Sequence, residues 1–153
     1  MANTFTQIHL QVIIAVKFRM GLISSDWESR LFDYLIAIIH NHGHKVLAIN
    51  GMPDHIHILF GFRPNQSLSE LIQLLKASSS KWINEEKLTK YKFAWQEGYG
   101  AFSYTKSDVP KVVKYIIQQK EHHRKSSFLE EYRKILDNLE IEYNPVYIFK
   151  EPE

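Results

Sequence analysis

The sequence contains no cysteine, only six glycines and five prolines, and no long hydrophobic run. Without cysteine, disulfides, thiolate metal sites and cysteine nucleophiles are excluded, so any bound metal must use nitrogen and oxygen ligands. The longest apolar runs, such as Val12 to Val16, are far too short to span a bilayer, and the first residues lack a secretory-signal pattern. We therefore expect no membrane partner and a cytoplasmic location.

The chain also lacks a strong excess of either charge and any segment that would divide it. A net charge of +2 at pH 7 allows a nucleic-acid partner but does not require one. No repeat, low-complexity tract or linker rich in glycine or proline interrupts the sequence. With 44% hydrophobic residues available for a core, we expect residues 1–153 to form a single domain.

Hydrophobic periodicity predicts strands and helices in the order strand, helix, strand, strand, helix, strand, followed by two further helices. The four expected strands are residues 5–17, 44–50, 55–62 and 101–106. Of the four expected helices, the first begins near Ser25, the second carries Leu68 to Trp82 on its inward side, the third begins near Ser107 to Pro110 and the fourth begins at Ser127. Ser25 with Glu28 and Ser127 with Glu130 have capping-box spacing. The third helix is expected to run without interruption through "KVVKYIIQQKEHH".

This order is the split βαβ plan of a ferredoxin-like domain, also described as RRM-like. The fold class that we predict is therefore α+β, with one antiparallel sheet and additional C-terminal helices.

Two histidines stand one residue apart in "MPDHIHILFG", inside the third expected strand. Because side chains alternate along a strand, His55 and His57 point to the same face, about 7 Å apart. That spacing lets two imidazoles converge on one divalent ion. The alternative is a pair of half-buried histidines that hydrogen-bond to their neighbours. The histidines of "HNHGH", residues 40–44, fall at a helix end, where we expect a structural role.

A second polar group lies on the third expected helix. Tyr115, Gln119 and His122 form a polar edge beside its apolar stripe, and Tyr115 and Gln119 are neighbours at i and i+4. Gln119 turns toward the packed side, whereas Gln118 lies closer to solvent, so Gln119 is the better candidate ligand, with Gln118 as the alternative. Taken alone, the pattern also fits a boundary tyrosine with solvated glutamines.

Several separated stretches together resemble a known family. "NGMPDHIHIL", "SLSELIQLLKASSSKWIN", "WQEGYGAFSYTKS" and "YIIQQKEHH...SFLEEY" are similar to the single-tyrosine HUH transposases of small bacterial insertion sequences, with REP-associated tyrosine transposases as kin. The resemblance covers nearly the whole chain in the expected order. It implies that Tyr115 is the nucleophile and that His55, His57 and Gln119 hold a divalent metal, Mg²⁺ or Mn²⁺.

The same resemblance implies an activity and partners. Tyr115 is expected to attack single-stranded DNA, form a 5′-phosphotyrosine bond and release a 3′-hydroxyl that can later rejoin strands. No ATP or organic cofactor is needed. The expected partners are single-stranded DNA hairpins at element ends and a second copy of the chain, in a homodimer whose composite active sites exchange the tyrosine helix.

Basic and aromatic residues are expected to contact the DNA. The candidates for phosphate contacts are Lys17, Arg19, Lys76, Lys81 and His122, and those for stacking are Phe18, Trp95, Tyr99, Phe102 and Tyr104. Core packing is the alternative for the aromatic residues, most of all for Phe102 and Tyr104.

Two other functions remain open at this stage. One is a related HUH enzyme, such as a replication initiator, a relaxase or a host-adopted endonuclease that acts on genomic hairpins. The other is a non-catalytic nucleic-acid-binding module of ferredoxin-like fold, a class that usually reads RNA from aromatics on the sheet.

Overall fold

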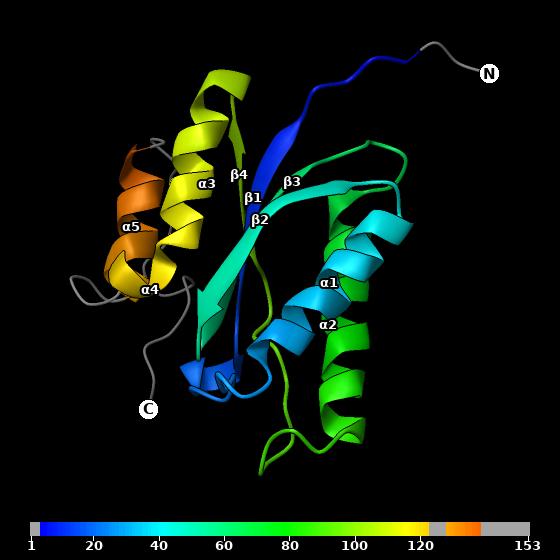
Figure 1. Cartoon of the computed structure of the whole chain (residues 1–153), viewed down its shortest axis with the longest axis vertical. Coiled ribbons are helices and arrows are strands. Elements are labelled where there is room, and N and C mark those ends of the chain that lie inside the picture. The colour runs from blue at the N-terminus through cyan, green and yellow to red at the C-terminus, as the bar shows by residue number, and fades with distance from the viewer. Residues whose placement is uncertain (1–3, 123–127, 139–153) are drawn as a thin grey trace.

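The computed structural model describes residues 4–122 and 128–138 and centres on one four-stranded antiparallel sheet (Figure 1). The strands are β1 (His9–Ala15), β2 (Lys45–Met52), β3 (His55–Gly61) and β4 (Gly100–Tyr104). They lie in the order β2-β3-β1-β4, so β3 and β1 are central. With α1 and α2 in the two crossovers, this is the ferredoxin-like α+β fold that the sequence predicts.

Helices cover both faces of the sheet. On one face lie α1 (Glu28–Asn41) and α2 (Leu68–Glu85), and on the other lie α3 (Val109–Ile117), α4 (Gln119–His122) and α5 (Phe128–Asn138) (Figure 1). The strands alternate between these layers. The larger core, under α1 and α2, takes one set of alternate residues, which includes Val12, Ile14, Ile56, Ile58 and Phe60. The second face receives the other set, which includes Ile13, Ala15, Leu59 and Phe102.

Some element boundaries differ from those expected. β1 is shorter than residues 5–17, because its partners pair only with His9–Ala15; residues 17–19 form a short 3-10 turn, η1. β4 ends at Tyr104, and a second 3-10 turn, η2, occupies Lys106–Asp108. Trp27, rather than Ser25, is the N-cap of α1 and makes no side-chain capping bond.

The Ser25 capping box is wrong because the carboxylate of Glu28 pairs instead with Lys120, at 2.8 Å. By contrast, the Ser67 side chain caps α2 by accepting a hydrogen bond from the Glu70 amide. The expected start of the fourth helix at Ser127 lies outside the described residues.

The third expected helix is divided in two. Gln118 has φ −91° and ψ 18°, so α3 ends at Ile117 and α4 begins at Gln119. Asn50 of β2 provides the physical reason, because its side-chain amide donates hydrogen bonds to the Ile116 and Ile117 carbonyls. Those carbonyls would accept from the backbone one turn later in a continuous helix.

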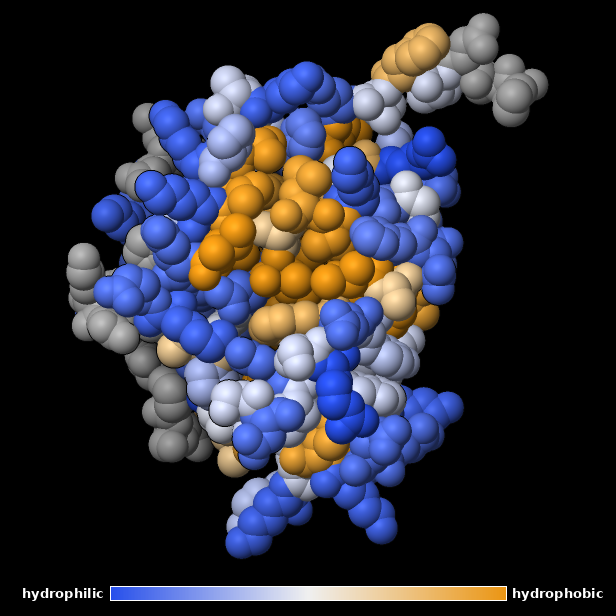
Figure 2. Space-filling view, in the orientation of Figure 1, coloured by the Kyte–Doolittle hydropathy of each residue, from blue (hydrophilic) through white to orange (hydrophobic). Residues whose placement is uncertain are grey.

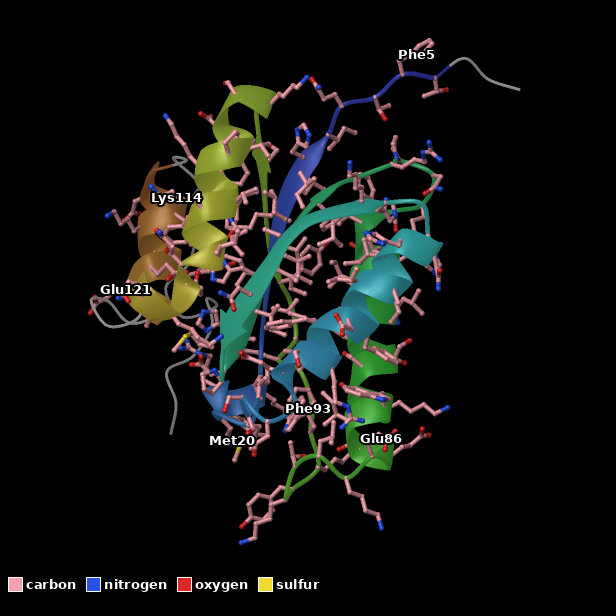
Figure 3. The ribbon with its side chains drawn as sticks, viewed as in Figure 1. Phe5, Met20, Glu86, Phe93, Lys114 and Glu121 are labelled. Atoms are coloured by element: carbon pink, nitrogen blue, oxygen red, sulfur yellow. The ribbon has the colours of Figure 1, made fainter. Side chains whose placement is uncertain are left out.

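The surface that includes the edge strand β2 is partly apolar. In the orientation of Figure 1, hydrophobic residues gather in the middle of the face, over β2 (Figure 2). The partly buried hydrophobic residues of β2 include Val46, Leu47 and Ile49. Lys114 and Glu121, in contrast, lie on the exposed side of α3 and α4 (Figure 3). Among the described residues, no helix is long and apolar enough to cross a membrane.

Candidate active site and metal centre

Two histidines of β3 project from the sheet into the layer of α3, α4 and α5. His55 and His57 are 0% exposed, and their ring centroids lie 5.2 Å apart. Ile56 and Ile58, which alternate with them, pack into the core on the opposite face. The structure thus places both imidazoles on one face, as the period of the strand predicts, and the central position of β3 keeps them away from the sheet edges.

The Nδ1 atom of each imidazole donates a hydrogen bond to a neighbouring side chain. His57 Nδ1 lies 2.7 Å from Gln11 Oε1, and the Gln11 amide nitrogen donates in turn to the Tyr104 hydroxyl at 2.8 Å. His55 Nδ1 lies 2.7 Å from Asp54 Oδ1. Because each partner atom accepts, each Nδ1 donates, and the Nε2 atoms are left as candidate ligand atoms for a metal. Such second contacts orient the imidazoles that bind metals.

Asp54 is itself fixed by Arg19. The Arg19 Nη2 and Nε atoms donate to Asp54 Oδ2 at 2.8 and 3.1 Å, and Arg19 is only 3% exposed. Burial raises the pKa of Asp54, but the hydrogen bonds and charges of His55 and Arg19 outweigh it and hold this pKa at about 2. Asp54 therefore remains an anion that can hold His55 in one orientation.

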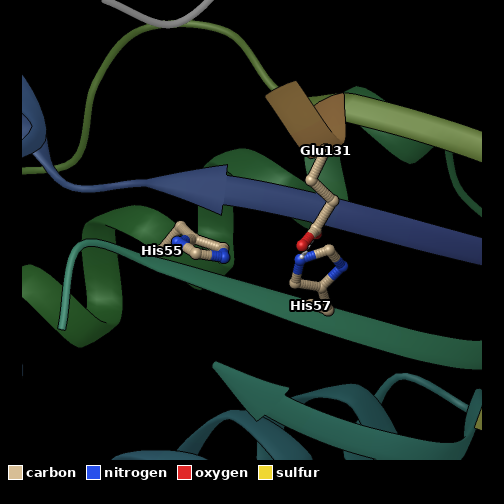
Figure 4. Close-up of side chains that lie close together, drawn as sticks. All are labelled: His55, His57 and Glu131. Carbon is tan, nitrogen blue, oxygen red and sulfur yellow. Dashed lines mark ion pairs between the residues drawn. The ribbon is translucent and has the colours of Figure 1, made fainter. Parts of the chain in front are cut away.

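Gln119 and Glu131 meet above the histidines. Glu131 extends from α5 toward His57 (Figure 4), with Oε1 2.9 Å from His57 Nε2. This contact has the length of an ion pair but not the angles of a hydrogen bond. The Gln119 amide nitrogen donates to both Glu131 oxygens, at 3.0 and 3.2 Å, and the Gln119 side chain is fully buried. Gln118, the alternative ligand, is exposed.

Tyr115 lies beside the same cluster within its own chain. Its ring centroid is 6.4 Å from that of His57, and its hydroxyl hydrogen-bonds to Glu131. Burial first, then the negative charge of Glu131 and the hydrogen bond to it, and last Tyr104, raise the pKa of Tyr115 above the ordinary 10.0. The phenol is therefore neutral around pH 7, and a neutral phenol is a weak nucleophile.

The donor set is suited to a divalent cation. Ligand atoms of His55, His57 and Glu131 all lie within 4.8 Å of one another. Gln119 Oε1 is buried and accepts no hydrogen bond from any residue that the structure describes. An acceptor left in that state is costly unless something else satisfies it. Imidazole nitrogens with amide and carboxylate oxygens suit Mn²⁺ and related ions, while Mg²⁺ prefers oxygen alone.

The residues expected to bind DNA phosphates are placed differently from one another. Arg19 is buried against Asp54, so in this structure it supports His55 from within, and its expected contact with DNA stays a prediction. Lys76 donates to the Gln96 and Gly98 carbonyls, and burial lowers its pKa despite an opposing effect of Glu97. Lys17 and Lys81 are exposed, and Lys81 has only a loose 3.9 Å pair with Glu85.

The side chain of His122, another expected phosphate contact, lies outside the described residues. Among the aromatic candidates, Trp95 and Phe102 are buried in the two cores, and Trp95 donates to Ser79. Tyr99 and Tyr104 are half-buried and bonded to Ser69 and Gln11. Phe18, 47% exposed, remains available for stacking.

Several site residues were not found by sequence reasoning. Gln11, Asp54 and Glu131 were not singled out. Two signals were present: Gln11 is a polar residue within an apolar strand, and Glu131 adjoins Tyr132 on the inward face of α5. The histidines of "HNHGH" are structural as expected; for example, His44 contacts Gln66 and accepts from the Arg63 amide.

Comparisons with known structures agree with this fold. A Deinococcus radiodurans crystal structure described as a transposase has a TM-score of 0.63 and 21% identity, covering 78% of this chain and 95% of the other. A REP-associated tyrosine transposase bound to a REP hairpin has a TM-score of 0.61 and 13% identity, and the match covers 100% of this chain and 96% of the other. At these identities the likeness establishes the fold alone.

Sequence comparisons identify the family. The ISDra2 transposase TnpA of Deinococcus radiodurans is 29% identical over 75 residues, which are 49% of this chain and 54% of the relative. The match therefore spans about half the length of that relative. The model of the family described as "Transposase IS200 like" matches residues 4–119, which hold the whole sheet, His55, His57, Tyr115 and Gln119. Because this match covers most of the chain, the protein belongs to the family of IS200-like transposases.

Proposed function

We propose that this transposase cleaves and rejoins single-stranded DNA through a covalent 5′-phosphotyrosine bond formed by Tyr115. The observation that carries the proposal is the convergence of Tyr115, His57 and Gln119 on the buried carboxylate of Glu131. A nucleophile thus lies beside a cluster of metal-ligand side chains, in the layer between the sheet and the helices. Such a cluster has little use in a module that only binds nucleic acid.

His55, His57 and Gln119 would hold the divalent cation. The cation would supply polarisation of the scissile phosphate, which an unactivated phosphodiester requires. Asp54 and Gln11 keep the two imidazoles in one orientation, so little reorganisation is needed when the substrate arrives. The buried Gln119 Oε1 would be a neutral oxygen ligand.

In the cleavage step, the Tyr115 oxygen bonds to phosphorus as the bond from phosphorus to the 3′-oxygen breaks. The phenol loses its proton and the 3′-oxygen gains one, so the products are a 5′-phosphotyrosine and a free 3′-hydroxyl. Attack of a 3′-hydroxyl on the phosphotyrosine reverses these bond changes and rejoins strands. Phosphodiester energy is retained in the covalent bond, so no nucleotide cofactor is consumed.

We propose single-stranded hairpins at insertion-sequence ends as the substrate. Support comes from the family and from the relative of similar fold whose structure was solved bound to a REP hairpin. A homodimer with composite active sites was expected from the sequence, but the chain brings its own Tyr115 to His57. We therefore propose that Tyr115 acts on the metal site of its own chain and treat the exchanged homodimer as the alternative arrangement.

The test is formation of a covalent adduct with a labelled single-stranded hairpin oligonucleotide in Mn²⁺ or Mg²⁺. The wild-type protein should give a denaturant-resistant adduct that protease removes, and chelator should abolish it. Tyr115→Phe, which keeps the ring, should bind the hairpin but form no adduct. Tyr91→Phe is the matched control, because Tyr91 is 62% exposed. An adduct with Tyr115→Phe would contradict the assigned nucleophile, and hairpin binding without any wild-type adduct would favour a binding module.

A further inference from the structure

One carboxylate contacts three side chains of the proposed site. Glu131 lies 2.9 Å from His57 Nε2, accepts from the Gln119 amide with both oxygens and hydrogen-bonds to Tyr115. It belongs to α5, which begins at Phe128 and so lies beyond residues 4–119 that match the family model. The site of this chain thus includes a group from outside the matched region.

The position of Glu131 fixes the orientation of the Gln119 amide. A carboxylate only accepts hydrogen bonds, so it draws the amide nitrogen of Gln119 toward itself. The amide is planar, and Oε1 must therefore point away from Glu131, where no described residue donates to it. Without Glu131, no carboxylate would fix the positions of the oxygen and the nitrogen of this amide.

The stability of the fold does not require a carboxylate at position 131. α5 is anchored by Tyr132 and Leu136, which pack in an apolar cluster with Ile13, Ala15 and Phe102. Glu131 is only 5% exposed. Burying a carboxylate costs free energy that its partners repay incompletely, and apolar replacements of buried ion pairs are often as stable or more so. A buried carboxylate beside candidate metal ligands therefore indicates a role in the site.

We propose that Glu131 is the fourth side chain of the metal site: it supplies a carboxylate oxygen to the cation, since ligand atoms of Glu131, His55 and His57 all lie within 4.8 Å of one another, and it holds the Gln119 amide in one orientation. This inference rests on the metal site of the proposed function. It makes α5 a part of the catalytic centre, and it predicts that loss of Glu131 lowers the metal affinity and, through the metal, the rate at which Tyr115 reacts.

The test is Mn²⁺ binding by the full chain without DNA, measured by calorimetry or by the electron paramagnetic resonance of free Mn²⁺. Glu131→Gln keeps the size of the side chain but loses the charge and one acceptor oxygen. We expect it to bind Mn²⁺ about 10- to 100-fold more weakly than the wild type, and Glu131→Asp to recover part of the affinity. Glu130→Gln is the matched control, since it makes the same change at an exposed neighbour on the same helix and should bind normally.

Three outcomes would overturn the proposal. Unchanged Mn²⁺ affinity in Glu131→Gln and Glu131→Ala, with a lowered Tm, would assign Glu131 a structural role. Tighter binding by Glu131→Ala would show that the carboxylate obstructs the site. Absence of Mn²⁺ binding by the wild type would refute the metal site as a whole.

Failure of this proposal can be separated from failure of the proposed function. Metal-dependent adduct formation with normal Mn²⁺ binding by Glu131→Gln would refute only the role of Glu131. Glu131-dependent Mn²⁺ binding that His57→Ala abolishes, in a protein that forms no adduct, would refute only the cleavage activity.

Discussion

Gln11 of β1 and His57 of β3 are joined by a 2.7 Å hydrogen bond between Gln11 Oε1 and His57 Nδ1. The Gln11 amide nitrogen is fixed in turn by the Tyr104 hydroxyl, at the end of β4. A polar chain therefore crosses three adjacent strands beneath the site. His57 Nδ1 is therefore bonded to a side chain of the sheet, and His57 Nε2 points toward Glu131.

We expect Gln11→Met to weaken Mn²⁺ binding about 10-fold or more, because His57 loses the acceptor that orients its ring. Leaving buried polar groups without partners should also lower the free energy of unfolding by about 1–3 kcal/mol. Calorimetric metal titration and denaturant unfolding measure the two effects. The exposed Gln73→Met serves as control, and normal Mn²⁺ affinity in Gln11→Met would contradict the orienting role.

Asn50 should control the position of Gln119. Its amide donates to the Ile116 and Ile117 carbonyls at the break between α3 and α4, and its oxygen accepts from Lys120. Asn50→Ala should let the helix continue and turn Gln119 away, so the adduct rate should fall about 10-fold or more while hairpin binding persists.

Asn50→Asp tests which function of this side chain matters. It retains an acceptor for Lys120 but loses the donor, so it should be as impaired as Asn50→Ala. Exposed Asn41→Ala should behave as wild type. Full adduct formation by Asn50→Asp would show that the bonds to the α3 carbonyls are dispensable.

Mixing two inactive variants distinguishes the two arrangements of the tyrosine. If Tyr115 serves its own chain, Tyr115→Phe combined with His57→Ala should give no adduct, because each chain lacks one component. If the helices exchange in a homodimer, one composite site regains both components and the adduct returns on the His57→Ala chain. Light scattering at the same concentration reports whether a dimer is present at all.

Alkaline pH should lower the free energy of unfolding through Tyr132 of α5. Burial raises the pKa of Tyr132 to about 12, whereas an unfolded tyrosine ionises near 10. Between these values the unfolded chain loses a proton that the folded chain keeps, so the stabilisation is present below pH 10 and is lost as pH rises toward 12. Unfolding midpoints of Tyr132→Phe should fall less steeply over this range. An identical slope in both proteins would show that Tyr132 does not ionise on unfolding.

Local periodicity was sufficient to predict the order of the elements and the direction of some site residues. Alternation along β3 places His55 and His57 on one face whatever the rest of the chain does, because the period of a strand is a property of its backbone. A continuous helix was expected to bring Tyr115 and Gln119 together, but the helix is broken at Gln118, and the two side chains meet at Glu131 instead. The composition and the family resemblance then gave these side chains a chemical meaning.

Tertiary structure alone decided which groups complete the site. Arg19 carries a charge that the sequence would place in solvent, yet it is buried because Asp54 faces it. The break between α3 and α4 depends on Asn50, a residue of a distant strand, and no local preference at Gln118 predicts it. Glu131 follows Glu130 in the sequence, but only the docking of α5 on the sheet turns one carboxylate inward and leaves the other in water. These contacts join segments far apart in the chain, so they form only when the sheet and helices pack, and local sequence patterns do not specify which residues become partners.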